Sequence, residues 1–162
     1  MNHNQPNILT LIRKIIRSAD IDSKRIEKEF GVSIPQLLTL QFLDMQKDFK
    51  ATSTQIKNHL ELNASTVTGI INRLLSKDLI AKIPNPKDGR GYFIILTAKG
   101  SHLLKKSPLT LQDTISKKIE SLTLEQSETL YKGIGLLINL LEAEDLDTTP
   151  LITLCDDLSK KQ

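Results

Sequence analysis

The sequence predicts a mainly α-helical fold (α+β) that contains one small β-hairpin. Apolar residues recur at three- and four-residue spacing along most of the chain, as they do on amphipathic helices. Residues 79–96 depart from this period and show the β-branched and aromatic pattern of two short strands around a turn. A third observation is the signal for a helix start, Ser or Thr followed three residues later by Gln, which begins at Ser33, Thr52 and Thr123.

The composition is that of an ordinary globular protein. The chain has 162 residues, of which 39% are hydrophobic and 25% are charged, so wholesale disorder is excluded. No segment approaches the roughly 20 apolar residues of a membrane span, and the N-terminus lacks the pattern of a signal peptide. We therefore expect a cytoplasmic protein that does not contact a membrane. Cys155 is the only cysteine, which excludes an intrachain disulfide framework and a Cys-based zinc finger.

The N-terminal third of the chain predicts three helices. The first covers residues 8–30 and ends at Gly31, because glycine readily adopts the left-handed conformation that closes a helix. The second follows Ser33 and carries Pro35 in its first turn, where proline is well tolerated. The third is short, over residues 54–60, and follows Thr52.

A fourth helix is predicted over residues 64–77, with Asn63 or Ser65 as its N-cap. Its helical wheel has two distinct sides. The apolar side carries Val67, Ile70, Ile71, Leu74 and Leu75, and the opposite side carries Ser65, Thr68, Gly69, Asn72 and Ser76. We expect the first side to be buried and the second, which is small and polar, to face outward.

A hairpin and further helices follow. Residues 79–83 and 92–96 are the predicted strands, and residues 85–91 form a turn with a basic, glycine-bearing tip. Thr97 is expected to cap a fifth helix, in which Pro108 implies a kink or break near the middle. A last long helix opens after Thr123 and runs to about residue 144, before an acidic tail.

Charge is distributed unevenly along the chain. Residues 1–49 hold 7 basic and 6 acidic residues, residues 50–106 hold 10 and 3, and residues 107–162 hold 5 and 10. A basic middle inside a chain of net charge +3 points to a polyanion-binding module, although solvated helix faces would give the same count.

Two short helices joined by a tight turn and followed by a hairpin make a winged helix-turn-helix. Its second helix must bury one face and present the other to the major groove of DNA, while the hairpin reaches the adjacent minor groove. Arg73 could reach a phosphate, with an intramolecular ion pair as the alternative. The predicted DNA-binding residues of the helix are Asn63, Ser65, Thr66, Thr68, Gly69, Asn72 and Arg73, and those of the wing are Lys82, Lys87, Asp88, Gly89 and Arg90.

Residues 62–80 and 88–100 together resemble the MarR (multiple antibiotic resistance regulator) family. The shared pattern is a recognition helix ending in Arg-Leu, then Asp-Arg-Arg, then Leu-Thr-x-x-Gly. The resemblance implies a dimeric winged-helix repressor or activator, in which Arg90 enters the minor groove and Asp88 orients the wing. Gly89 replaces the middle Arg, and Asp78 stands where a Gly is usual. It further implies a small-molecule effector pocket, for which Phe42, Phe49 and Tyr131 are candidate lining residues or, equally, core residues.

The ends of the chain predict a homodimer. An Ile-rich first helix and a Leu-rich last helix cannot both bury their apolar stripes in so small a core, so a two-fold axis would cover them. The predicted interface residues are Ile8, Leu11, Ile12, Ile15, Leu130, Ile134, Leu137 and Leu141. Two-fold symmetry in turn predicts a pseudo-palindromic operator in double-stranded DNA.

This reasoning divides the chain into four segments. Residues 1–32 form an N-terminal dimerisation helix, 33–100 the winged helix-turn-helix, 101–144 the C-terminal dimerisation helices and 145–162 the acidic tail.

No residue pattern indicates an enzyme, a metal site or a cofactor. The three histidines are scattered, and no Ser–His–Asp or paired-carboxylate arrangement can be argued from spacing. The alternative function is a winged helix that docks other proteins and does not bind DNA. Docking faces usually expose aromatic or aliphatic anchors, whereas the outer face of residues 64–77 is polar.

Overall fold

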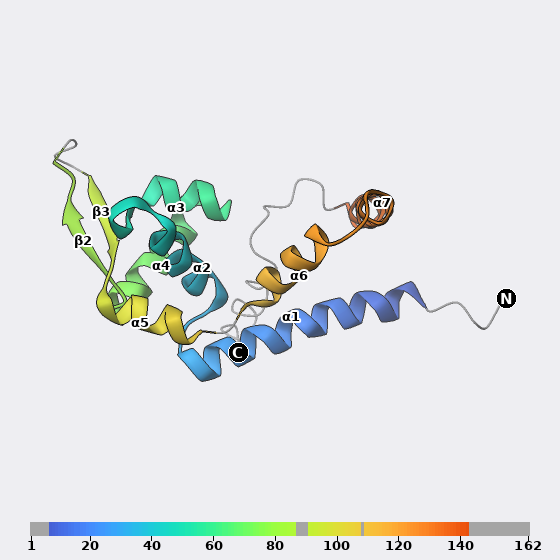
Figure 1. The fold of residues 1–162 in the computed structure, drawn as a ribbon, viewed down its shortest axis with the longest axis horizontal. Helices are drawn as coiled ribbons and strands as arrows, with labels where there is room; N and C mark the ends of the chain where they lie inside the picture. Colours follow the sequence, from blue (N-terminus) through green and yellow to red (C-terminus); the bar gives the residue numbers. More distant parts are fainter. Residues whose placement is uncertain (1–6, 87–90, 108, 143–162) are drawn as a thin grey trace. The chain divides into compact units, whose positions relative to one another are not determined.

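The computed structural model describes residues 7–86, 91–107 and 109–142. These residues belong to two compact units, one ending at Ser107 and one beginning at Leu109. The first unit contains five α-helices and a three-stranded sheet, and the second contains two α-helices (Figure 1). The mainly α-helical fold with a small β-hairpin is therefore confirmed. Within the described residues, no helix is both long and apolar enough to cross a bilayer.

The first three helices lie where the sequence predicts them. They are α1 (Ile8–Phe30), α2 (Ile34–Met45) and α3 (Ser53–Leu60). Gly31 ends α1 with a left-handed φ of 66°. Capping boxes are present at Ser33 with Gln36 and at Thr52 with Gln55, as the sequence indicates. A 3-10 turn, η1 (Lys47–Phe49), joins α2 to the first strand.

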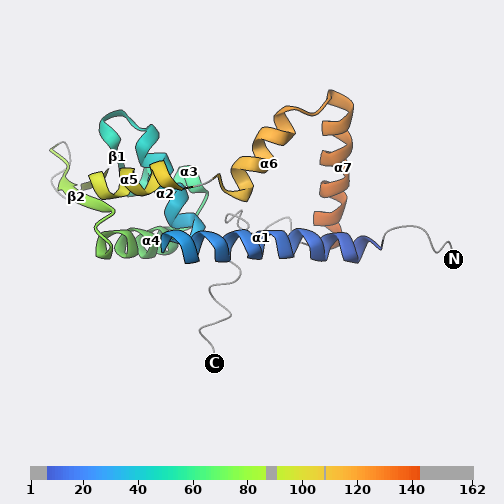
Figure 2. The same ribbon diagram turned by 60° about the horizontal axis from the view of Figure 1, so that its bottom comes forward.

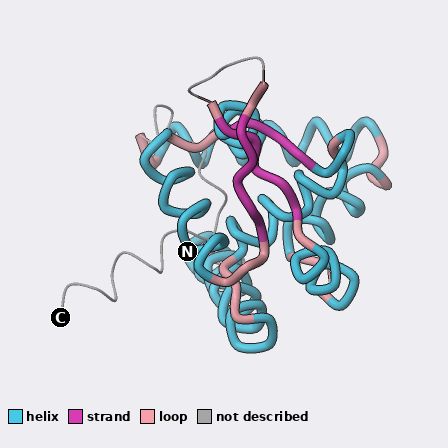
Figure 3. Tube along the Cα trace, turned by 90° about the vertical axis from the view of Figure 1, so that its left-hand side faces the viewer, coloured by secondary structure: helices cyan, strands magenta, loops and turns pink. Residues whose placement is uncertain are grey.

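The sheet has one strand more than the sequence analysis identifies. Strands β2 (Ile80–Pro84) and β3 (Tyr92–Leu96) form the predicted hairpin, and β1 (Lys50–Thr52) pairs with the other edge of β3. Figure 3 shows the strands of the sheet side by side, and both pairings are antiparallel. Ile94 lies opposite Ala51 on one side and Lys82 on the other. Since β1 contains only three residues, its tertiary pairing and not its composition makes it a strand.

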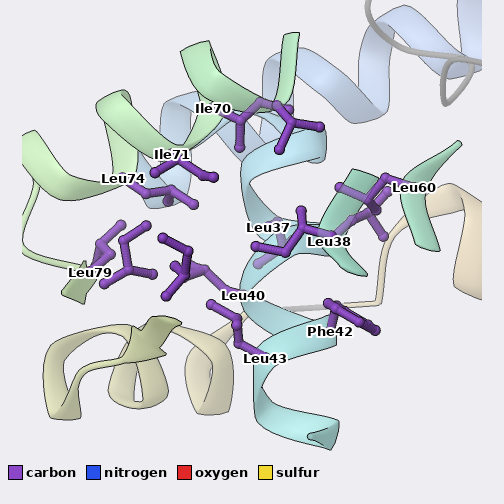
Figure 4. Packing of buried hydrophobic residues seen from close by; sticks show 14 of the residues in the cluster. Leu37, Leu38, Leu40, Phe42, Leu43, Leu60, Ile70, Ile71, Leu74 and Leu79 are labelled. Carbon is purple, nitrogen blue, oxygen red and sulfur yellow. The ribbon is translucent and has the colours of Figure 1, made fainter. Parts of the chain in front are cut away.

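The hydrophobic core is built around α2. Leu37, Leu40 and Leu43 are fully buried, because α3, α4 (Ala64–Ser76) and α5 (Ala98–Lys106) all pack on this helix. From α4, Ile70, Ile71 and Leu74 point into the core, and Leu79 joins them from the segment before β2 (Figure 4). At about 1.5–3 kcal/mol for each large apolar side chain removed from water, these contacts fix α4 firmly to the rest of the unit.

The C-terminal helices differ from the prediction in one respect. The sequence predicts one helix with a kink or break near Pro108, whereas α5 ends at Lys106 and a separate helix, α6, spans Leu111–Glu120. Thr110 caps α6 through a capping box with Asp113. The sequence analysis missed this box because it considered only Gln three residues after the Ser or Thr. The last helix, α7 (Leu124–Leu140), starts at the predicted Thr123 box and ends before residue 144. The acidic tail lies outside the described residues.

Candidate nucleic-acid interface

A tight turn and an asparagine cap set the direction of α4. Glu61 ends α3 in the left-handed region with φ of 53°, and only three residues separate α3 from α4. Asn63 is the N-cap of α4, and its Oδ1 accepts hydrogen bonds from the Thr66 backbone N–H at 2.8 Å and the Ser65 hydroxyl at 2.6 Å. Of the two caps that the sequence allowed, the structure has Asn63. Helices α3 and α4 therefore form the predicted helix-turn-helix.

The two sides of α4 are as different as its wheel predicts. Val67, Ile70, Ile71 and Leu74 are at most 4% exposed. The side directly opposite carries Ser65, Gly69, Asn72 and Ser76, of which the three with polar side chains are exposed. In Figure 2, α4 lies along the edge of its unit. The exposure of Ser65, Asn72 and Ser76 shows that the polar side is accessible to a ligand. Asn63 and Thr68 are also exposed, and Thr66 is half-buried.

Positive charge lies at the far end of the same helix and on the hairpin. Arg73 is exposed, and it makes no ion pair with any residue that the structure describes. The sequence raised an intramolecular ion pair as the alternative role of Arg73. Among the residues that the structure describes, Arg73 forms no such pair. Lys82 is exposed on β2. The hairpin is closed below its tip by a hydrogen bond of 3.0 Å from the Asn85 N–H to the Gly91 carbonyl oxygen. Lys87, Asp88, Gly89 and Arg90 lie outside the described residues.

Behind α4, Thr97 and Gly100 fix the start of α5 against the start of β2. The Thr97 hydroxyl accepts a hydrogen bond from the Gly100 N–H and donates to the carbonyl oxygens of Asp78 and Leu79 at 2.8 and 3.0 Å. A Cβ on Gly100 would collide with the Leu79 carbonyl oxygen and lie 2.7 Å from Leu96 Cδ1. The Leu-Thr-x-x-Gly sequence is thus a packing motif. The sequence analysis identified the motif but not these hydrogen bonds or the close contact at Gly100 that explain it.

Lys77 connects the end of α4 to the end of α1. Its ammonium group donates hydrogen bonds to the Gly31 carbonyl oxygen and to Gln36 Oε1. Gly31 closes α1, and Gln36 belongs to the capping box that opens α2. The residue that caps the end of α4 therefore hydrogen-bonds directly to the junction between α1 and α2. This contact joins residues far apart in sequence, so periodicity could not reveal it.

Each of the two units exposes an apolar helix face. On α1, Ile8, Leu11 and Ile15 are 68%, 44% and 60% exposed, while Ile12 is half-buried and Ile26, on the same stripe, is fully buried. On α7, Leu130, Ile134 and Leu141 are exposed and Leu137 is half-buried. The predicted interface residues therefore leave most of their apolar surface without a partner in the described part of the chain.

The candidate effector residues separate into two groups. Phe42 is part of the core and stacks on the His59 ring, with 4.2 Å between ring centroids. Phe49 and Tyr131 are exposed, and Tyr131 lines an apolar groove of about 280 Å³ on α6 and α7 together with Ile119, Leu130, Ile134 and Ile138. Among the described residues, no group of His, Cys, Asp or Glu side chains is arranged to hold a metal ion.

Comparison with known proteins gives the same interpretation as the helix-turn-helix and the hairpin. Residues 30–91 match the sequence model of the MarR family. The chain therefore resembles MarR-family proteins over the segment that contains α2, α3, α4 and β2. It is 24% identical over 111 residues to the uncharacterized HTH-type transcriptional regulator YsmB of Bacillus subtilis, covering 68% of this chain and 75% of that protein.

Other matches are with proteins whose names or structures are more specific. The chain is 29% identical over 80 residues to the multiple antibiotic resistance protein MarR of Escherichia coli, an alignment that covers 49% of this chain and 56% of MarR. The chain thus spans just over half the length of that relative. Its fold is similar to S. aureus MepR in a DNA complex, with a TM-score of 0.63, 20% identity and coverage of 83% of this chain and 98% of MepR. Its fold is also similar to that of Sco3205 of Streptomyces coelicolor in complex with DNA, with a TM-score of 0.62 and 18% identity. That match covers 91% of this chain and 98% of Sco3205.

Proposed function

We propose that this chain is a transcriptional regulator of the MarR family, and that it is a homodimeric, sequence-specific repressor that binds double-stranded DNA. One observation carries the proposal: the side of α4 opposite the core is exposed and polar, and it bears no aromatic or aliphatic anchor. A helix of this kind fits the major groove, where amides and hydroxyls meet base edges. The protein-docking alternative requires apolar anchors on that face and is disfavoured for this reason.

The proposed contacts divide between specificity and affinity. Ser65, Thr68, Gly69 and Asn72 would face base edges, while Asn63, Thr66 and Arg73 flank them near the sugar-phosphate backbone. The wing residues Lys82, Lys87, Asp88, Gly89 and Arg90 would follow the adjacent minor groove, with Arg90 inserted into it. Basic residues outnumber acidic ones by 10 to 3 over residues 50–106, which supports the assignment of affinity to this region.

The homodimer is supported by the exposed apolar faces of α1 and α7. Fully burying a large exposed side chain contributes about 1.5–3 kcal/mol. Because Ile8, Leu11 and Ile15 are 68%, 44% and 60% exposed, two copies of them offer about 5–10 kcal/mol before the cost of association. Two-fold symmetry then places two α4 helices on one side of a pseudo-palindromic operator, with half-sites about one helical turn apart.

A salt series tests DNA binding. The purified protein is titrated with DNA from upstream of its own gene and with a scrambled competitor, at several salt concentrations. We expect the affinity to fall with salt, with a log–log slope of about −0.9 for each neutralised phosphate and therefore several units for a dimer. Arg90→Ala should weaken binding strongly. An affinity independent of salt would contradict the proposal. If the protein binds the upstream DNA no more tightly than the scrambled competitor, a genome-wide pull-down of bound fragments is the next measurement, because it can find a distant operator.

Sedimentation of two matched variants tests the dimer. Ile15→Asp places a charge on the exposed apolar stripe of α1, and Thr10→Asp places the same charge on the opposite, exposed side of that helix. We expect Ile15→Asp to sediment as a monomer at micromolar concentration and Thr10→Asp to remain a dimer. If both variants stay dimeric with unchanged affinity, the apolar stripe of α1 is not part of the interface.

Repression and control by a small-molecule effector complete the proposal. Both follow from the resemblance to the MarR family, and the apolar groove lined by Tyr131 on α6 and α7 offers a surface of suitable chemistry. A reporter driven by the bound operator should be silenced by the protein. Its response to a panel of aromatic and amphipathic compounds, compared between the parent and Tyr131→Ala, measures effector control.

A further inference from the structure

The outward face of α4 also indicates which base pairs it reads. From Ser65 to Asn72 the helix advances seven residues, or about 10 Å, which corresponds to about three base-pair steps. Residues 63–72 include no Lys or Arg, so this stretch lacks the side chains that usually bind guanine through its O6 and N7 atoms. The first cation along the helix, Arg73, lies in its last turn.

The hydroxyl groups on this face have their hydrogens engaged within the helix. The Ser65 hydroxyl donates to Asn63 Oδ1 at 2.6 Å, and the Thr68 hydroxyl donates to the Ala64 carbonyl oxygen at 2.8 Å. What remains available to a ligand is the lone pairs of each oxygen. In the major groove such oxygens can accept from the amino groups of adenine N6 or cytosine N4, and they are repelled by the two acceptors of guanine. The hydroxyl groups alone therefore do not distinguish A·T from G·C pairs.

Asn72 adds the second part of the argument. Its exposed side-chain amide makes no hydrogen bond with any residue of the described chain, so its donor and its acceptor are both free for a ligand. An asparagine amide pairs bidentately with adenine N6 and N7. Thr68 carries a methyl group that suits the methyl group of thymine, and Gly69 has open space where a Cβ would stand, so the helix can approach the bases closely.

We infer that the Asn72 amide reads one adenine in each half-site. This inference rests on the proposed function, because it assumes that α4 enters the major groove. It adds the identity of one base and assigns Asn72 as a specificity-determining residue.

In vitro selection with the full-length protein and a randomised duplex library tests the inference. We expect the selected half-sites to contain one invariant adenine in the major-groove segment. Changing that A·T pair to G·C should lower the affinity by about 5- to 100-fold. Enriched half-sites without an invariant adenine in this segment would overturn the inference and leave the proposed function intact. If no sequence is enriched over the starting library, sequence-specific binding itself is refuted.

Variants of Asn72 connect the preference to one side chain. In Asn72→Ala the discrimination at the invariant adenine should fall to about onefold, while the affinity for scrambled DNA stays within about twofold of the parent. Asn72→Arg should instead select guanine at that position. Gln112→Ala removes an exposed amide from α6 and is the matched control, with unchanged selection. Retention of the adenine preference in folded Asn72→Ala, as judged by circular dichroism, would overturn the role of Asn72.

Discussion

Gly100 gives the sharpest test of how this fold is held together. Gly100→Ala adds one methyl group at the point where α5 begins against β2. That methyl group would fall well inside van der Waals contact with the Leu79 carbonyl oxygen and 2.7 Å from Leu96 Cδ1. The first of these is a backbone atom, which cannot rotate away, so α5 must shift relative to β2.

The size of the effect follows from three contributions. Overpacking in a buried position costs about 1–3 kcal/mol. A shift of α5 also weakens the hydrogen bonds that the Leu79 carbonyl oxygen accepts from the Thr97 hydroxyl at 3.0 Å and the Thr97 N–H at 3.2 Å, each worth about 0.5–1.5 kcal/mol. The greater helix propensity of Ala returns about 1 kcal/mol. We therefore expect Gly100→Ala to lower the free energy of unfolding by about 2 kcal/mol.

Gly69→Ala is the matched control, because the chemical change is the same and the surroundings are open. No atom lies within 4 Å of a Cβ at Gly69, which occupies the interior of α4. Helix propensity alone should then raise the free energy of unfolding by about 0.5–1 kcal/mol. Urea denaturation followed by circular dichroism measures both variants, at one protein concentration because association stabilises the folded state. If the two variants differ by less than about 1 kcal/mol, the close approach at Gly100 does not constrain the fold.

Substitutions at two further positions, one near each end of α4, test local stability. Asp78 has a left-handed φ of 58°, which glycine adopts without strain, and its exposed ion pair with Lys99 at 3.6 Å contributes little. Asp78→Gly should therefore raise the midpoint of urea unfolding, and Asp78→Ala should lower it. The order would be reversed if the ion pair outweighed the backbone conformation. Asn63→Ala removes the N-cap of α4 and should lower the free energy of unfolding by about 1 kcal/mol, whereas Asn63→Asp should keep most of it. Equal losses in both variants, measured in the same way, would show that the cap is not the cause.

The sequence predicted best those features that depend on neighbouring residues. The boxes at Ser33, Thr52 and Thr123 are local, since a side chain reaches a backbone group three residues away, and all three are present. The polar side of α4 was also predictable, because a helix of 13 residues gives its wheel enough members to define a buried side.

Features that depend on distant residues could not be predicted in the same way. β1 has too few residues to show a period, and it is a strand only because Ala51 lies opposite Ile94. Pro108 indicated an interruption, but whether a helix bends or ends there depends on the new cap at Thr110. For the DNA-binding residues, the outward positions on α4 are described, whereas the wing tip at residues 87–90 remains a prediction from sequence.

The contact between Lys77 and the end of α1 gives a structural link between the proposed dimer interface and the proposed DNA-binding helix. One stripe of α1 is buried in the winged-helix core at Ile26 and exposed from Ile8 to Ile15, so the same rigid helix serves the core and the proposed interface. Lys77 hydrogen-bonds the Gly31 carbonyl oxygen at the end of that helix, and it directly follows the last residue of α4. A change in the direction of α1 would therefore strain this hydrogen bond or move the end of α4. In the proposed dimer, which engages two half-sites together, a rotation of α1 in each subunit would alter the distance between the two α4 helices, and so the affinity for the operator.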